Sequence, residues 1–520
     1  MRTSHILGAF CLGGAALSMS ACSSPAERAA AAGAQAQQLL DGGRYREAVT
    51  QLDYALRERD DLPGLWLLLG RAKMALRDAP GAYAAYRNAL DQDPSNREAL
   101  FSLSQLSLAA GQYGEAEDYA GQVLLLTPGE PNALVLQAFA ALGLGRAADA
   151  GRLAAEVLKN DPTSELGFTI KSMIAYRDGD YAEAASLLQE PFRRDTNSID
   201  VLRQLRRIYR KTADIRNMVI VTGRIARLQP DEINQLDYAR SLYAAGDVAR
   251  GGRVLQAMKP DTGATRRSAI VAMWMNGAVA PEMLTADSAI GGKKWVRLAL
   301  AEMCNRMGRA DLVLGILGDE RATDVRIDNV DGQGALAAAL FATGHRSEAI
   351  RRAQAVLAIE ERQPWALLVR AWDAFDRKAL DAALRDVRVV VADSPALSEG
   401  HELLAAIYRA QGEVSAADRA VVNASRNLSD EVDKLQYSVS YLTDKSKLGM
   451  VLSLTKDFVA RNPLSRAGWK LRRDACASTG DTGCVTRATE FLGRLSGKSI
   501  DYSVDPEEGG ASAAEEFFAS

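Results

Sequence analysis

Apolar positions in this chain recur at helical spacing in short segments that end at glycine or proline. One such segment runs from Leu100 to Ala110, and Gly111 ends it. A second follows and reaches Leu126, after which Thr127-Pro128 closes it. Glycine supplies the backbone freedom that a helix C-terminus needs, and proline cannot continue a helix. The pattern therefore predicts two helices joined by a tight turn.

The same pattern returns at a fixed step. Prolines stand at 94, 128, 162 and 230, with gaps of 34, 34 and 68, and glycines stand at 111, 145 and 179. Farther along, glycines 344, 412 and 480 are spaced by 68, as are prolines 395 and 463. A constant period of this length indicates a repeat architecture. Neither helix of a pair can bury its apolar side alone, so each pair must pack on its neighbours.

The register slips once. Gly179 and Gly344 are 165 residues apart, five short of five repeats, and Pro230 and Pro395 are also 165 apart. We expect two arrays in register, separated by an irregular stretch at 246–329. We interpret this stretch as divergent helical hairpins, with one pair between Lys294 and Gly318 that turns near Gly308. A flexible hinge between domains is the alternative.

The repeat unit resembles the tetratricopeptide repeat. The matching residues in four successive units are Trp66, Gly70, Ala82, Tyr86, Ala89 and Pro94; Leu100, Leu103, Ser104, Gly111, Tyr113, Ala116 and Pro128; Ala138, Gly145, Ala150 and Pro162; and Phe168, Ser172, Gly179, Tyr181 and Ala184. The resemblance implies an all-α, right-handed superhelix, an α-solenoid of about a dozen helix-turn-helix hairpins. Two departures stand out, since Pro191 shortens the second helix of its repeat and Thr196 replaces a lattice proline.

The first residues have the pattern of a targeting segment. Arg2 gives a charged start, the apolar run from Ile6 to Leu17 is too short to span a membrane, and Met19-Ser20-Ala21-Cys22 resembles a bacterial lipobox. The resemblance implies cleavage before Cys22, lipidation of this cysteine and, because Ser23 is not Asp, sorting to the outer membrane. The stack would then face the periplasm. An ordinary secretory signal with an incidental cysteine is the alternative.

Together these patterns predict five segments, which are a lipoprotein signal peptide at 1–21, a repeat array at 27–245, divergent hairpins at 246–329, a second array at 330–498 and an acidic disordered tail at 499–520. Acidic residues in the tail are Asp501, Asp505, Glu507, Glu508, Glu515 and Glu516, and no Lys or Arg occurs from 500 to 520. The tail could occupy a basic groove in cis or dock on a partner through Phe517-Phe518. A plain solubilising tail is the alternative.

Charge and motifs argue against nucleic-acid binding and against catalysis. The chain has 63 basic and 66 acidic residues, a formal charge of −3, and so no broad basic field. Beyond the signal, His345 and His401 are its histidines, far apart and without the spacing of metal ligands or a catalytic triad. Zinc-protease, nucleophile-elbow and Cys-x-x-Cys motifs do not occur. We therefore expect no enzyme activity, no cofactor and no metal.

Three cysteines follow Cys22. Cys476 and Cys484 stand on either side of Gly480, the turn of the last predicted hairpin. In an oxidising compartment they are a candidate disulfide, and two buried free thiols are the alternative. Cys304 falls on an apolar helical face and is predicted to be a core residue.

One basic cluster stands above the background. Arg203, Arg206, Arg207, Arg210 and Lys211 fall in one predicted helix, and spacings of three and four place Arg203, Arg207, Arg210 and Lys211 on one face. By the resemblance, this face and Phe139, Leu142, Met173 and Tyr176 of the preceding repeats line the concave groove. The hypothesis is a site for an acidic or carboxylate-terminated peptide. A solvated cationic face paired with acids of the neighbouring repeat is the alternative, and core packing explains Phe139 and Met173 equally well.

The resemblance implies a protein that works by holding others. We expect a membrane-anchored periplasmic adaptor or scaffold that binds envelope proteins or peptides. Tetratricopeptide lipoproteins serve pilus assembly, secretion, outer-membrane biogenesis and polysaccharide export, and among these we favour pilus assembly or secretion. The alternative is a partner protein in exopolysaccharide or peptidoglycan synthesis or export.

Overall fold

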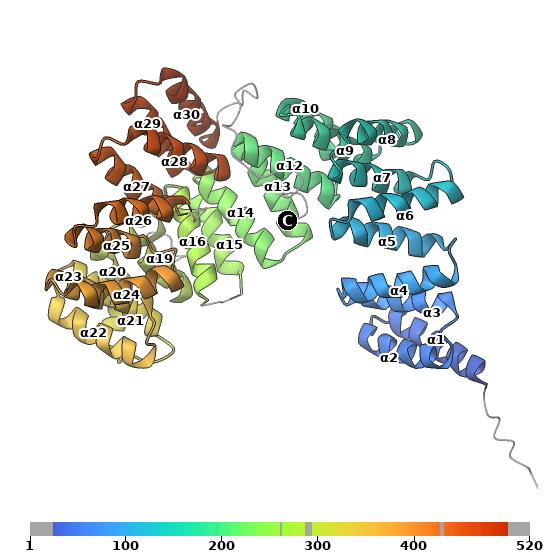
Figure 1. The fold of residues 1–520 in the computed structure, drawn as a ribbon, viewed down its shortest axis with the longest axis horizontal. Coiled ribbons are helices and arrows are strands. Elements are labelled where there is room, and N and C mark those ends of the chain that lie inside the picture. The colour runs from blue at the N-terminus through green and yellow to red at the C-terminus, as the bar shows by residue number, and fades with distance from the viewer. Residues whose placement is uncertain (1–23, 195, 260–262, 286–293, 427–430, 498–520) are drawn as a thin grey trace, which may run out of the picture. The chain divides into compact units, whose positions relative to one another are not determined.

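The computed structural model describes residues 24–497, apart from 195, 260–262, 286–293 and 427–430 (Figure 1). The described residues are helical throughout, with one short 3-10 helix and no strand among them. They divide into two compact units, one up to Pro162 and one from Thr163 onward. The prediction of an all-α solenoid of hairpins is confirmed.

The first unit consists of four helical hairpins. Their helices are α1 (Pro25–Asp41), α2 (Tyr45–Glu58), α3 (Pro63–Ala75), α4 (Ala79–Gln92), α5 (Arg97–Ala109), α6 (Tyr113–Leu126), α7 (Pro131–Gly143) and α8 (Ala147–Asn160). Each helix contacts the next along the chain, and the first helices of neighbouring hairpins also contact one another, α1 with α3 and α5 with α7.

The hairpin of α5 and α6 shows why the sequence folds in this way. The Asn96 side chain accepts a hydrogen bond from the Ala99 N–H at 3.0 Å and caps the start of α5. Gly111, at φ +72°, turns the chain where a side chain would be strained. Between the helices, the buried Ser104 hydroxyl donates to the Ala116 carbonyl at 2.8 Å. The small residues of the repeat therefore stand where the two helices approach each other.

The second unit contains the remaining helices. They are α9 (Glu165–Arg177), α10 (Tyr181–Leu187), α11 (Gln189–Arg193), α12 (Ile199–Thr212), α13 (Ile215–Leu228), α14 (Glu232–Ala245), α15 (Val248–Ala257), α16 (Ala264–Asn276), α17 (Pro281–Thr285), α19 (Lys294–Arg306), α20 (Ala310–Ile316), η1 (Gly318–Ala322), α21 (Val330–Ala342), α22 (Arg346–Ile359), α23 (Pro364–Asp376), α24 (Leu380–Asp393), α25 (Ser398–Ala410), α26 (Val414–Arg426), α27 (Val432–Asp444), α28 (Leu448–Arg461), α29 (Arg466–Ser478) and α30 (Thr482–Leu495).

Several local predictions are confirmed here. Around Pro191, the second helix of its repeat breaks into the short α10 and α11. The pair α19 and α20 turns at Gly308, with φ +70°. Ala213 takes the left-handed turn position with φ +54°, although it is not glycine and stands one 34-residue step after Gly179.

The last hairpins of the second unit pack against its earlier helices. Helices α27 and α29 contact α16, which precedes them by more than 150 residues (Figure 1). One hydrophobic core contains Leu205 of α12 and Val221 of α13 together with Trp469 of α29 and Phe491 of α30. The unit is therefore more than a simple row of hairpins, because its C-terminal helices bury apolar surface on helices from its N-terminal half.

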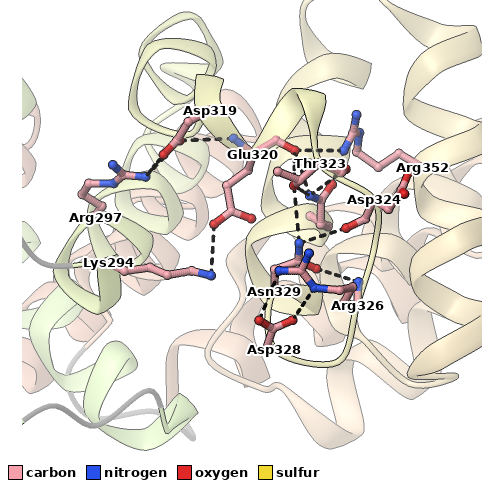
Figure 2. Close-up of polar contacts among 11 residues, drawn as sticks. Lys294, Arg297, Asp319, Glu320, Thr323, Asp324, Arg326, Asp328, Asn329 and Arg352 are labelled. Atoms are coloured by element: carbon pink, nitrogen blue, oxygen red, sulfur yellow. Dashed lines mark hydrogen bonds and ion pairs between the residues drawn. The ribbon is translucent and has the colours of Figure 1, made fainter.

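Polar side chains hold the loop between α20 and α21 (Figure 2). Arg297 pairs with Asp319 at 2.9 Å, and Lys294 reaches the buried Glu320 at 3.5 Å. Asn329 donates to the Asp324 carbonyl at 3.0 Å, and Arg352 donates to the Arg321 carbonyl at 2.8 Å.

Further contacts in this cluster accept hydrogen bonds on the backbone. Gln333 donates to the Glu320 carbonyl at 2.8 Å, and the Asn329 side chain accepts from the Arg326 N–H at 2.7 Å. The irregular stretch is thus built from short helices whose connection is bonded through its backbone. The segment boundaries predicted from the sequence stay predictions.

Candidate functional site

The basic cluster predicted for the groove lies on α12. Its helical spacing comes from apolar residues such as Leu202, Leu205 and Ile208, which are fully buried. Arg203, Arg207 and Lys211 are half-buried, and Arg210 is exposed. The structure brings one predicted pair of groove residues together, since the Arg207 guanidinium lies over the ring of Tyr176, 5.3 Å from its centroid.

Phe139, the other aromatic residue of the predicted groove, lies on α7 in the first unit. It is half-buried and packs against the core cluster that contains Leu108, Ala116 and Leu136. The contacts of Phe139 are therefore those of core packing within its own unit. Its membership in a binding groove stays a prediction.

One arginine of the cluster is paired with an acid of the next hairpin. Arg206 of α12 and Asp237 of α14 form an ion pair at 3.2 Å, and both side chains are less than one-fifth exposed. Arg240 lies on the other side of the same carboxylate at 3.8 Å. For Arg206, the alternative of a cationic side chain paired with a neighbouring acid therefore describes what the structure has.

Arg210 belongs to a different arrangement. It lines a pocket of about 190 Å³ together with Arg240 of α14 and Arg461, the last residue of α28. All three side chains are exposed. The pocket is completed by α16 and by the residues between α28 and α29, so its walls come from distant parts of the second unit.

Two of these arginines were not predicted from the sequence. Arg240 had a usable signal, because it precedes the left-handed Gly246 by six residues, as Arg207 precedes the left-handed Ala213. Alignment of the two helices on their turns would have placed both arginines at one repeat position. Arg461 had no such signal, since only the contact of the last hairpins with the earlier helices brings it near α12.

A second set of charged residues is buried where α19, α25 and α27 meet. Arg306 pairs with Asp433 at 2.7 Å, and both side chains are less than one-tenth exposed. Burial raises the pKa of the nearby Glu399 to about 7, partly offset by the Arg306 charge. Burial and the Lys434 charge lower the pKa of His401 to about 4. These groups join helices of the same unit and lie in its interior, which indicates a structural role.

The cysteines lie as follows. Cys476 of α29 and Cys484 of α30 form a disulfide, with their Cα atoms 5.7 Å apart. Cys304 is fully buried, as its apolar helical face predicts, and burial raises the pKa of its thiol to about 12. Cys22 and the acidic residues from Asp501 onward lie outside the described residues.

Two searches of the described residues bear on the class of protein. None of their helices is both long enough and apolar enough to cross a membrane. They also contain no group of three or more His, Cys, Asp or Glu side chains placed to hold a metal ion. His345 is exposed and His401 is buried on a different helix, so the two histidines do not share a site.

The chain is similar to several solved structures of low sequence identity. They include a tetratricopeptide repeat protein from Parabacteroides merdae, with 14% identity over 41% of this chain and 84% of that chain and a TM-score of 0.38. PilF from Pseudomonas aeruginosa has 17% identity over 41% and 96% of the two chains, with a TM-score of 0.32. PilW, a type IV pilus biogenesis factor, has 16% identity over 40% and 96%, with a TM-score of 0.34.

The sequence comparisons concern the repeats. No curated protein matches the chain. The family model of the tetratricopeptide repeat matches residues 74–138, which cover α4, α5 and α6 in full and most of α7. This segment contains the Gly111 turn and the Ser104–Ala116 contact described above. The chain is therefore a tetratricopeptide repeat protein, with the family match at residues 74–138.

Proposed function

We propose that this protein is an adaptor of the bacterial envelope, anchored in the outer membrane through a lipid on Cys22 and facing the periplasm. Its partners are envelope proteins or peptides with acidic segments, and pilus assembly or secretion is the process we favour. The anchoring rests on the lipobox-like sequence Met19-Ser20-Ala21-Cys22. Two lipid chains or more give stable attachment, whereas a single chain binds membranes only marginally.

The observation that carries the adaptor proposal is the layer formed by first helices. Successive first helices contact one another in both units, α5 with α7 in the first, and α21, α23, α25, α27 and α29 in turn in the second. Such a layer presents side chains of many repeats on one extended surface. In the second unit, α12 adds three arginines and a lysine at the predicted groove positions, which favours acidic partners through charge-assisted hydrogen bonds.

In-cell crosslinking of the intact protein tests the adaptor proposal. The variant has Arg203, Arg207 and Arg210 changed to Ala, and the matched control has the exposed Arg351, Arg385 and Arg419 changed to Ala. We expect pilus or secretion components to be crosslinked in the wild type and the control and lost in the variant. Recovery of glycan-synthesis enzymes, or of the same proteins from all three chains, would contradict the proposal.

The anchor is tested separately. Cys22→Ala should abolish incorporation of labelled palmitate and release the protein from membranes, and Ser23→Asp should move the acylated protein to the inner membrane. Cell fractionation with both variants checks these outcomes. A Cys22→Ala protein that stays acylated would refute the lipid anchor without bearing on the adaptor role.

A further inference from the structure

The pocket near Arg210 has the chemistry of a site for carboxylates. Its three charged lining residues, Arg210, Arg240 and Arg461, are all basic, and none of its lining residues is acidic. Asn462 and Ser465 add polar side chains. A cavity of about 190 Å³ with this lining is large enough for one or two carboxylate side chains and for no large ligand. Arginine is suited to carboxylates because its guanidinium donates two parallel hydrogen bonds.

The helix ends at this place already have their own cations. Helices α12 and α14 end here, and a helix C-terminus favours a positive charge. Arg494 donates to the Thr212 carbonyl at 3.1 Å, and Arg466 donates to the Ala244 carbonyl at 2.9 Å. Neither of these two arginines lines the pocket. The three lining arginines therefore add positive charge beyond what serves the two helix ends.

The nearest acid does not neutralise the excess. Asp237 lies 3.8 Å from Arg240, but its shorter contact, at 3.2 Å, is with Arg206. One carboxylate is thus shared between two arginines. An anion entering the pocket would reduce the repulsion among Arg210, Arg240 and Arg461, and exposed side chains can rearrange to bind it.

An acidic segment of the same chain begins beside the pocket. Helix α30 ends at Leu495, whose carbonyl accepts a hydrogen bond from Arg466 at 2.9 Å. The same nitrogen of Arg466 also bonds the Ala244 carbonyl, and Ala244 lines the pocket. The chain then continues to Asp501, Asp505, Glu507 and Glu508, with no basic residue after Lys498.

We propose that Arg210, Arg240 and Arg461 form a carboxylate site that the acidic residues at 501–508 of the same chain occupy. The first of these acids is six residues beyond Leu495, and an extended chain covers about 3.3 Å per residue. A short tether of this kind gives an effective concentration on the order of millimolar, so individually weak contacts suffice in cis. The segment closes the pocket to other acidic peptides until one displaces it. This inference does not depend on the proposed envelope role.

Binding of a labelled peptide tests the proposal. The probe is a synthetic peptide of residues 500–510, followed by fluorescence anisotropy at low salt. One chain is the wild type, and the other carries Asp501→Asn, Asp505→Asn, Glu507→Gln and Glu508→Gln. Because its own segment no longer competes, the neutralised chain should bind the probe at least about tenfold more tightly.

The pocket is tested in the neutralised chain. Arg210→Gln, Arg240→Gln and Arg461→Gln together should abolish probe binding, while Arg351→Gln, Arg385→Gln and Arg419→Gln leave it unchanged. Far-UV circular dichroism checks that both variants are folded, and each single arginine change offers a milder test if the triple variant is not. Equal affinity of the wild type and the neutralised chain would overturn the proposal. So would equal binding by the pocket variant and its control.

Discussion

Arg306 and Asp433 form a buried ion pair across 127 residues of sequence. Two nitrogens of the guanidinium donate to the carboxylate, Nη2 to Oδ1 at 2.7 Å and Nε to Oδ2 at 2.9 Å. The Arg306 side chain is 3% exposed and that of Asp433 is 7% exposed. The pair joins the end of α19, in the irregular stretch, to the start of α27, in the C-terminal hairpins. It is therefore a specific tie between distant repeats of the second unit.

Removal of one member of this pair should destabilise the protein strongly. Arg306→Ala leaves the Asp433 carboxylate buried without its cation, at a cost of about 3–5 kcal/mol. Arg306→Met combined with Asp433→Leu should lose much less, because no charge is then left buried. Urea denaturation followed by circular dichroism measures both. The exposed pair Arg309–Glu282 is the control, and Glu282→Ala should cost no more than about 1 kcal/mol. Similar losses from Arg306→Ala and Glu282→Ala would contradict the prediction.

Stability should depend on pH through Glu399. Burial raises the pKa of its carboxyl from about 4.5 to about 7, so between these values the folded protein holds a proton that the unfolded chain has released. The stability of the wild type relative to Glu399→Gln is therefore fully present below about pH 4.5 and is lost as the pH rises through about 7.

Urea midpoints of the two proteins between about pH 5 and pH 8 check this dependence. His401 has its pKa lowered and loses stability on acidification instead, but it is present in both proteins and cancels in the difference. A difference in midpoint that is constant over the range would contradict the assignment to Glu399.

The disulfide should stabilise the last hairpin. It closes a loop across a sequence separation of 8 residues, for which loop-closure entropy corresponds to about 2–3 kcal/mol. Reduction of the wild type should lower the melting temperature. A Cys476→Ser/Cys484→Ser variant should start lower and show no response to the reductant. Thiol titration of the denatured protein, before and after reduction, counts the released thiols, and an equal response of both proteins would refute the prediction.

Gly70 should not tolerate a methyl group. A Cβ at this position of α3 would lie 2.6 Å from the ring of the buried Tyr86 on α4, so Gly70→Ala should cost about 1–3 kcal/mol through overpacking. Gly114 of α6 is the matched control, because a Cβ there meets no atom within 4 Å. Gly114→Ala should be neutral or stabilise by up to about 1 kcal/mol. Thermal denaturation compares the two variants, and a neutral Gly70→Ala would show that the hairpin can open at no cost.

Local features of the hairpins could be predicted because they depend on residues close in sequence. Gly111 ends one helix through its own backbone freedom, and Pro191 divides a helix through its missing N–H. Ser104 and Ala116 are small where two adjacent helices touch. The buried position of Cys304 followed from its place on an apolar helical face.

The candidate site was predictable only in part. The sequence marked Arg210, since helical spacing groups the basic residues of α12 on one face. It did not mark Arg461 as a neighbour, because no periodic rule relates residues 251 positions apart. The separation of Phe139 and Tyr176 into different compact units was likewise invisible to the repeat register, which treats all hairpins alike.

The sequence by itself thus determined the helices, their turns and the repeat that joins them, since these arise from backbone and side-chain preferences within about 34 residues. Only the tertiary structure decided that α27 and α29 contact α16 and that Arg466 and Arg494 bind the carbonyls at the ends of α14 and α12. The physical reason is that stacking each hairpin on the next is a local rule, whereas its accumulated curvature determines which distant repeats meet. The basic pocket exists because of that meeting.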